Sequence, residues 1–135
     1  MVSISVFFPC YNEQENVDRT AEKAIRTLER LDADFEVIIV DDGSSDRTPQ
    51  IADEISRRDS RVKVVHHQRN LGYGAALQSG FRAAAKQLVF YTDGDGQFDI
   101  EEMPPLLELM DQYDIVSCYR INRQDSLGRK IAGHM

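Results

Sequence analysis

The chain has 135 residues, a formal net charge of −7 and a pI near 4.9, and 41% of its residues are hydrophobic. These values suit a globular chain with one core, so we expect residues 1–135 to form a single domain, and they argue against nonspecific nucleic-acid binding, which needs a basic surface. Apolar stretches end well before the roughly 18 residues of a membrane span and no signal-peptide pattern is present, which predicts a cytoplasmic location.

Apolar runs alternate with segments of helical periodicity along the chain. Runs rich in β-branched and aromatic residues predict strands over residues 3–9, 35–40, 62–67, 87–92 and 114–119. Helical spacing of apolar residues predicts helices over residues 13–31, 48–57, 75–84 and 101–112. Asp46 is the expected N-cap of the second helix, with Pro49 in its first turn. The alternation predicts an α/β fold in which helices cover both faces of a mainly parallel sheet.

Polar, acidic and glycine residues follow four of the predicted strands. The segments are PCYNE after the first, DDGSS after the second, TDGDGQ after the fourth and YR after the fifth. Ligands of parallel α/β sheets bind at the carboxyl ends of the strands, near a change in strand order. This edge of the sheet is therefore the predicted site.

The densest group of acidic residues lies in FYTDGDGQFDIEE, residues 90–102. Asp93, Asp95 and Gln97 offer hard oxygen ligands that suit Mg²⁺ or Mn²⁺. Such a cation would let an acidic protein hold an anionic diphosphate, and the two intervening glycines allow close approach of the backbone. The alternative is a surface turn whose aspartates only cap the next helix.

Three other metal- or nucleotide-binding motifs do not match the sequence. Counted from Asp93, an EF-hand needs Gly at the sixth position and Glu at the twelfth, where the chain has Phe98 and Pro104. GYGAAL has Leu77 in place of the third glycine of a dinucleotide-binding fingerprint, and no P-loop is present. A metal-bridged mononucleotide is the interpretation that remains.

Two more segments at this edge are ambiguous on their own. Asp42 can accept hydrogen bonds from a ribose or a base, or can serve only a turn and a helix cap. Tyr11 can stack on a base and Glu13 can accept hydrogen bonds, but a helix start capped by Asn12 explains PCYNE equally well. The pair HH at 66–67 ends a strand, where neighbouring side chains face opposite ways, so a structural role is expected rather than joint binding of one ion.

The segments FFPCYNEQENV, VDDGSSDRT, NLGYGAALQSGF and YTDGDGQFD together resemble, in order and spacing, the family 2 glycosyltransferases of GT-A fold. They are most similar to the polyprenyl-phosphate sugar transferases, such as dolichol-phosphate mannose synthase and its bacterial relatives. The resemblance covers residues 4 to about 130. It implies a three-layer α/β/α, Rossmann-like domain and a metal-dependent, inverting transfer of a sugar from a GDP- or UDP-sugar to a polyprenyl phosphate.

The resemblance also implies roles for residues at the nucleoside end of the donor. Pro9, Tyr11 and Glu13 would contact the base and the ribose. Val40 and Asp42 would line the same pocket, with Asp42 reading the base. These five residues are the predicted nucleoside-binding set.

Further roles are implied at the diphosphate end. Asp93, Gly94 and Asp95 correspond to the DxD motif of the family. Asp95 and Gln97 would be the direct ligands of Mg²⁺ or Mn²⁺, and Asp93 would lie beside the ribose or the metal. Asp95 is accordingly one predicted catalytic residue.

Two arginines match phosphate-binding arginines of the family. Arg120 would lie near the donor diphosphate or the acceptor phosphate, and is the second predicted catalytic residue. Arg129 is a weaker match for another phosphate contact. The basic character of residues 120–130 agrees with an anionic partner, because the guanidinium group suits phosphate oxygens.

Members of this family usually have a longer catalytic domain, and many carry membrane helices after it. We therefore expect the chain to be the N-terminal half of such a domain, cut short on its C-terminal side, with no identifiable general base. Membrane association, at the cytoplasmic face, would come from segments outside it, and homodimerisation is one way to cover a shortened sheet. Two alternatives stay open, namely a nucleotide-binding module without catalysis and a family 2 glycosyltransferase acting on a polysaccharide or a protein.

Overall fold

The computed structural model describes residues 1–94, 99–110, 112–122 and 125–134. The chain divides into two compact units, Met1–Gly96 and Gln97–Met135. The first unit contains a four-stranded sheet, and the second contains a short helix and a two-stranded sheet. That residues 1–135 act as a single domain stays a prediction.

The sheet of the first unit is parallel throughout. It consists of β1 (Ser3–Cys10), β2 (Asp34–Asp41), β3 (Val62–His66) and β4 (Leu88–Tyr91), in the spatial order β3-β2-β1-β4. The central strands β1 and β2 are almost continuously buried, which explains why they are nearly uninterrupted apolar runs. The predicted α/β fold with a mainly parallel sheet is confirmed.

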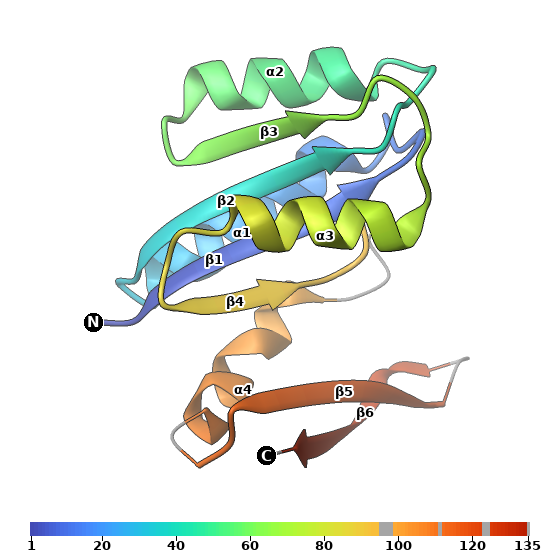
Figure 1. The fold of residues 1–135 in the computed structure, drawn as a ribbon. Coiled ribbons are helices and arrows are strands. Elements are labelled where there is room, and N and C mark those ends of the chain that lie inside the picture. Colours follow the sequence, from blue (N-terminus) through green and yellow to red (C-terminus); the bar gives the residue numbers. More distant parts are fainter. Residues whose placement is uncertain (95–98, 111, 123–124, 135) are drawn as a thin grey trace. The chain divides into compact units, whose positions relative to one another are not determined.

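Helices cover both faces of this sheet (Figure 1). α1 (Val17–Arg30) and α2 (Thr48–Arg58) lie on one face, and α3 (Tyr73–Ala83) lies on the other. The chain steps from β1 to β2 to β3 in one direction and then returns across the sheet to β4, and right-handed crossovers place the returning helix on the opposite face. The strand order reverses between β1 and β4, and ligands of open α/β sheets bind at the carboxyl ends of the strands near such a reversal.

The core follows the helical and strand periodicities of the sequence. Phe7, Ile38, Val40 and Ala76 form a buried cluster that joins β1 and β2 to α3. On α1, the buried apolar residues recur every three to four positions and include Val17, Ala21, Ala24 and Leu28. Both faces of the central strands β1 and β2 are thus covered, and the polar strand ends are left at the edge.

The start of α1 differs from the prediction. The expected helix began at Glu13, with Asn12 as its alternative cap, but α1 begins at Val17 and Asn16 is its N-cap position. Asn12 instead adopts a left-handed backbone conformation with φ of 54°, because its amide groups are bonded to the loop after β2. α2 begins at Thr48, as predicted, and the Asp46 carboxylate accepts the Thr48 N–H at 2.9 Å, although Arg47 occupies the N-cap position.

The second unit corrects the expectation for the last strand. It contains the 3₁₀ turn η1 (Ile100–Glu102), α4 (Met103–Leu109), β5 (Ile115–Asn122) and β6 (Asp125–His134). The strand predicted over 114–119 was expected in the parallel sheet, but β5 pairs with β6 in an antiparallel sheet of two strands. A parallel neighbour needs a crossover of about a dozen residues, whereas β6 follows β5 almost directly and so forms a hairpin.

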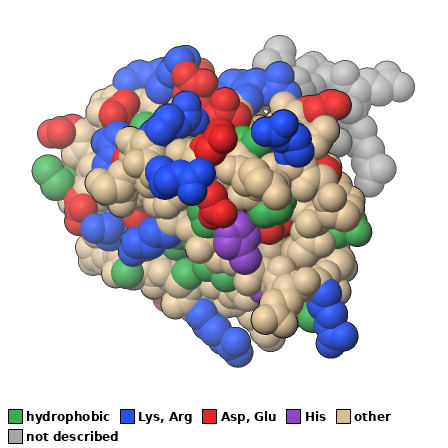
Figure 2. Space-filling view, turned by 90° about the horizontal axis from the view of Figure 1, so that it is seen from above, with side chains coloured by type: hydrophobic (Ala, Val, Ile, Leu, Met, Phe, Trp, Pro, Cys, Tyr) green, Lys and Arg blue, Asp and Glu red, His purple; other side chains and the backbone are tan. Residues whose placement is uncertain are grey.

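The described surface is mixed in charge. Figure 2 shows Lys and Arg side chains interspersed with Asp and Glu on the face seen from above, rather than gathered into one basic area. Among the described residues, no helix is both long and apolar enough to cross a membrane.

Candidate functional site

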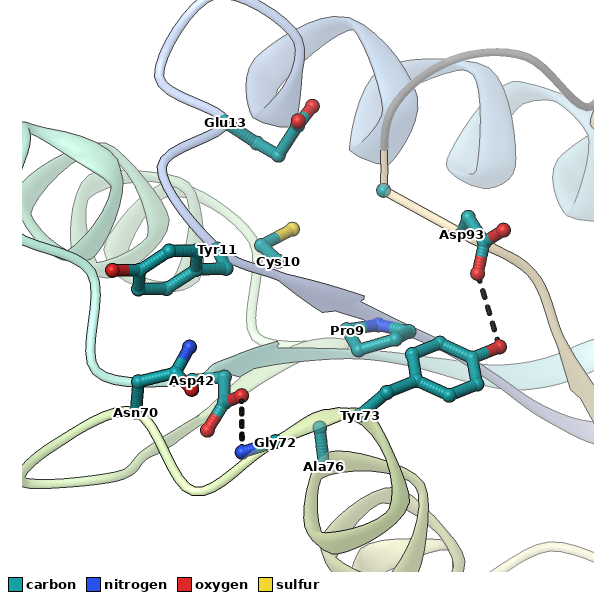
Figure 3. Close-up of a pocket in the computed structure, with 11 residues that line it drawn as sticks. Pro9, Cys10, Tyr11, Glu13, Asp42, Asn70, Gly72, Tyr73, Ala76 and Asp93 are labelled. Carbon is teal, nitrogen blue, oxygen red and sulfur yellow. Dashed lines mark hydrogen bonds between the residues drawn. The ribbon is translucent and has the colours of Figure 1, made fainter.

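A cavity of about 260 Å³ lies at the carboxyl ends of β1, β2 and β4, where the sequence predicts the site (Figure 3). Its volume is close to the lower end of the roughly 300–1,000 Å³ typical of small-molecule sites. The end of β1, the loops that follow the four strands and the start of α3 supply the lining residues Pro9, Cys10, Tyr11, Glu13, Asp42, Asn70, Gly72, Tyr73, Ala76, Asp93 and Gly94. Six of the predicted site residues are thus brought together, and their roles stay predictions.

One wall is built from two loops that bond each other. The backbone N–H groups of residues 12–14 donate to side chains of the loop after β2, including that of Glu13 to the buried Thr48 hydroxyl at 2.9 Å. In return, Ser45 N–H donates to Asn12 Oδ1 at 2.9 Å and Arg47 N–H donates to Gln14 Oε1 at 3.0 Å. These reciprocal bonds position Tyr11 and Glu13 at the rim of the cavity, because the backbone that carries them is satisfied on both sides.

Asp42 holds the opposite wall. Its side chain is only 6% exposed, and its carboxylate accepts the N–H groups of Leu71 at 2.9 Å and Gly72 at 3.1 Å. Gly43 adopts φ of 69°, and a Cβ there would lie 2.1 Å from the carbonyl carbon of Arg69, so only glycine lets the two loops meet. The alternative role predicted for Asp42 was to stabilise a turn and cap a helix. Its carboxylate instead accepts hydrogen bonds from the distant loop at 70–72.

The third wall is the segment after β4. The Tyr73 hydroxyl, at the first turn of α3, donates to Asp93 Oδ1 at 3.0 Å and so links the two sides of the cavity (Figure 3). Gly94 N–H donates to the Pro9 carbonyl at 3.2 Å. The first half of the predicted DxD motif is therefore anchored to the end of β1. Asp95 and Gln97, the predicted metal ligands, lie outside the described residues.

The cavity is acidic. Glu13, Asp42 and Asp93 contribute carboxylates, and none of the eleven lining residues, all of which the structure describes, is Lys, Arg or His. No three His, Cys, Asp or Glu side chains converge to hold a metal among the residues described. A diphosphate entering this cavity needs a cation beside it, and a hard divalent cation matches oxygen donors of this kind.

Three other predicted residues lie elsewhere. Val40 is fully buried in the core cluster under α3 and does not line the cavity. Arg120 and Arg129 belong to the second unit, where they are direct register partners across β5 and β6. Residues that are separated by eight others in sequence are thus placed opposite each other by the hairpin.

Two lining residues with polar groups were not assigned from the sequence. Asn70 and Tyr73 belong to NLGYGAALQSGF, one of the segments that carry the resemblance, but neither residue was given a role. The sequence feature that could have identified them is the short polar turn between a strand end and a helix start, which lies at the same edge of the sheet as the other motifs. Their exact neighbours follow from tertiary folding.

The paired histidines meet the paired aspartates of β2. His66 bonds Asp41 at 2.9 Å and Asp53 of α2 at 2.8 Å, while the next residue, His67, bonds Asp42 at 2.8 Å. Their rings lie on opposite faces of the sheet, as predicted. Burial lowers the pKa of His66, but hydrogen bonds to Asp41 and Asp53 outweigh it and leave the pKa raised above its ordinary value of 6.5.

The parallel sheet with helices on both faces, and the cavity at the carboxyl ends of its strands, are typical of Rossmann-like α/β proteins. The model of glycosyl transferase family 2 matches residues 5–134, and the chain belongs to this family.

Among curated relatives, the chain is 38% identical to undecaprenyl-phosphate 4-deoxy-4-formamido-L-arabinose transferase of Proteus mirabilis, over 98% of this chain and 41% of that protein. It is 39% identical to the enzyme of the same name from Edwardsiella ictaluri, with the same coverage. The chain therefore spans about two fifths of the length of these relatives.

Solved structures show the same fold. The mannosyltransferase PcManGT from Pyrobaculum calidifontis, in complex with GDP-Man and Mn²⁺, superposes with a TM-score of 0.75 at 22% identity, over 94% of this chain and 38% of that one. S. aureus TarS 1–349 in complex with UDP superposes with a TM-score of 0.65 at 24% identity, over 87% of this chain and 34% of that one.

Proposed function

We propose that this chain forms the donor-binding part of a glycosyltransferase that moves a sugar from a GDP- or UDP-sugar to a polyprenyl phosphate, with inversion and with a divalent cation. The observation that carries the proposal is the acidic cavity at the carboxyl edge of the sheet, within a family 2 chain. The names of the curated relatives, which are undecaprenyl-phosphate sugar transferases, support the acceptor class.

The nucleoside would occupy the part of the cavity between the loops after β1 and β2. The Tyr11 ring is 49% exposed and lines the cavity, so it can stack on a base, while Glu13 and Asp42 can accept hydrogen bonds from the ribose or the base. Pro9 completes this side without a polar side chain. Two carboxylate acceptors and one aromatic ring suit a nucleoside, which carries both N–H and O–H donors.

The diphosphate would lie toward Asp93 and the residues after it. Asp93, Asp95 and Gln97 would hold Mg²⁺ or Mn²⁺, because their oxygens are the hard ligands these cations prefer. When bound, the cation neutralises charge on the leaving nucleoside diphosphate. The Tyr73 hydroxyl and the bond from Gly94 to β1 orient the start of this segment.

The acceptor would be bound by basic residues of the second unit. Arg120 and Arg129, whose backbones are register partners on β5 and β6, would contribute to this binding, because guanidinium groups suit phosphate oxygens. A phosphate acceptor is ionised at neutral pH, so it needs no general base to become a nucleophile, whereas a hydroxyl acceptor would need one.

Calorimetric titration tests the donor site. UDP and GDP are titrated into the protein with Mn²⁺ and then with EDTA, and the titrations are repeated with Asp95→Asn. The matched control is Asp99→Asn, because among the described residues the Asp99 side chain accepts the Glu101 N–H at the start of η1 and lies outside the cavity lining. We expect binding that needs Mn²⁺, is lost in Asp95→Asn and persists in Asp99→Asn. Absence of binding in every condition would refute the proposed donor site.

A transfer assay tests the acceptor class. The protein is incubated with a labelled nucleotide sugar and with undecaprenyl phosphate, undecaprenol or a polysaccharide. The proposal predicts label in the lipid phosphate alone. Label in the polysaccharide would favour the alternative acceptor, and donor binding without any transfer would favour a nucleotide-binding module.

A further inference from the structure

His67 does not line the cavity, but its imidazole contacts Asp42, which does. Its side chain is 8% exposed. Nδ1 lies 2.8 Å from Asp42 Oδ1, and Nε2 lies 2.7 Å from the Ser79 hydroxyl of α3. Both ring nitrogens are therefore engaged, so the orientation of the ring is defined from two sides.

The direction of the first hydrogen bond follows from the carboxylate. An ionised aspartate only accepts hydrogen bonds, so the proton of this bond must lie on Nδ1 of His67. In the neutral ring, Nε2 then accepts from the Ser79 hydroxyl. Ser79 thereby selects the ring orientation in which His67 donates to Asp42.

The acceptor capacity of Asp42 is nearly used within the protein. A carboxylate has about four lone-pair sites. His67 and the Leu71 N–H occupy two sites on Oδ1, and the Gly72 N–H occupies one on Oδ2. One site on Oδ2 remains, on a residue that lines the cavity. Asp42 can therefore accept one further hydrogen bond, in a direction that the other three determine.

We propose that His67 is a positioning residue for the nucleoside site, which it orients by donating from Nδ1 to Asp42. The inference rests on the proposed function, because it takes the ligand of Asp42 to be the nucleoside part of a donor. Without the imidazole donor only the Leu71 and Gly72 N–H groups hold the carboxylate, so the direction of its remaining acceptor site is less well defined. Loss of His67 should thus weaken nucleotide binding while leaving the diphosphate end unchanged.

Two substitutions separate the donor from the bulk of the ring. In His67→Asn the amide nitrogen can occupy about the position of Nδ1 and keep the bond to Asp42. In His67→Gln the amide reaches instead the position of Nε2, near Ser79, and the donor to Asp42 is lost. Both variants remove the ring, so a purely structural role would affect them alike.

The experiment is titration of UDP, GDP and inorganic pyrophosphate into each variant in the presence of Mn²⁺. We expect His67→Gln to raise the nucleotide Kd about tenfold and His67→Asn to change it by no more than about twofold, as for loss of one hydrogen bond to a charged group. Pyrophosphate should bind all variants equally. Ser79→Ala, which retains the imidazole, should raise the nucleotide Kd by about threefold. This variant replaces His67→Gln in the test if His67→Gln does not fold.

The outcomes distinguish the inference from the proposed function. If the unaltered protein binds neither UDP nor GDP with Mn²⁺, the proposed function fails and the inference fails with it. If the unaltered protein binds and His67→Gln matches it, the inference alone is overturned. Equal losses of nucleotide and pyrophosphate binding in both His67 variants would also overturn it, since they would indicate general damage to the fold.

Discussion

At the scale of single residues, Gly94 shows how a missing side chain shapes the cavity. A Cβ at this position would lie 2.6 Å from Cys10 Sγ and 2.7 Å from the Pro9 carbonyl oxygen. Both neighbours belong to β1 in the buried sheet, so neither can move away freely. The backbone of the acidic segment therefore rests directly on the end of β1.

Gly94→Ala should consequently push this segment away from β1. We expect a loss of about 1–3 kcal/mol in the free energy of unfolding, as for overpacking of a core, together with at least a tenfold weaker nucleotide affinity in Mn²⁺. Urea denaturation and calorimetry measure the two effects. Gly74→Ala is the control, because a Cβ there meets nothing within 4 Å, and alanine in α3 should gain up to about 1 kcal/mol. Equal behaviour of the two variants would contradict the explanation.

At the scale of elements, Glu36 of β2 joins the neighbouring strands. The residue is 3% exposed, and its carboxylate accepts from the Ser5 hydroxyl of β1 at 2.6 Å, from Lys63 Nζ of β3 at 2.6 Å and from the Ala85 N–H before β4 at 2.7 Å. Burial raises the pKa of Glu36, but the hydrogen bonds from Lys63, Ser5 and Ala85 outweigh it and leave the pKa below its ordinary value of 4.5.

Glu36→Gln should therefore destabilise the sheet. We expect a loss of about 2 kcal/mol, because charged hydrogen bonds are replaced while the groups around them stay buried. In the unaltered protein, the stability due to Glu36 is present above pH 4.5 and is lost as the pH falls through the lowered pKa. Urea unfolding at several pH values measures both. Asp34→Asn, which removes an exposed ion pair with Lys86, should change stability by less than about 1 kcal/mol.

His66 should contribute a pH dependence of the opposite sign. It bridges Asp41 of β2 and Asp53 of α2, and its raised pKa means that the protonated ring is favoured in the folded state. Its stabilisation is present below pH 6.5 and is lost as the pH rises through the raised pKa. The midpoint of thermal unfolding should fall over that window, and His66→Gln should make the fall smaller. An unchanged slope in the variant would contradict this assignment.

Most helices and strands could be predicted because the buried residues recur in the sequence with the spacing of a helix or a strand. β1 and β2 are continuous apolar runs since both of their faces are covered, and the residues that α1 buries have helical spacing. The predicted start of α1 was too early because the N–H groups of residues 12–14 are bonded to residues 44–48 instead of lying in a helix. Nothing in the local sequence indicates that residues 44–48 lie nearby. The partner of β5 was missed because residues 120–130 were taken as a basic stretch, and no strand was predicted after residue 119.

At the scale of the whole molecule, ligand binding should be visible as added stability. The protein has a net charge of −7 and an acidic cavity, so a nucleotide alone should bind poorly. We expect UDP or GDP with Mn²⁺ to stabilise the fold, by about 2.7 kcal/mol at a hundred times the Kd, and EDTA to abolish the effect. Differential scanning calorimetry measures the shift. Equal stabilisation with and without the metal would contradict a metal-bridged diphosphate.

The location of the site was predictable at this scale, but its internal bonds were not. Parallel strands bring PCYNE, Asp42 and Asp93 to one edge, which topology alone requires. The use of Asp42 by the loop at 70–72, and the bond from Tyr73 to Asp93, depend on how α3 packs across the sheet. Such contacts join residues 20 to 30 positions apart, and the sequence holds no local trace of them.

The paired aspartates and histidines also bear on how β3 finds its alignment. Val64 and Val65 discriminate poorly between alignments, because they are adjacent and a shift by one position would exchange one valine for the other. The two imidazoles do discriminate. A shift of β3 by one residue in either direction would leave one of the two buried aspartates without its imidazole, at the cost of an unmatched carboxylate. The hydrogen bonds between the adjacent aspartates and the adjacent histidines thus disfavour misaligned pairing of β3 with β2, which Val64 and Val65 alone would not prevent.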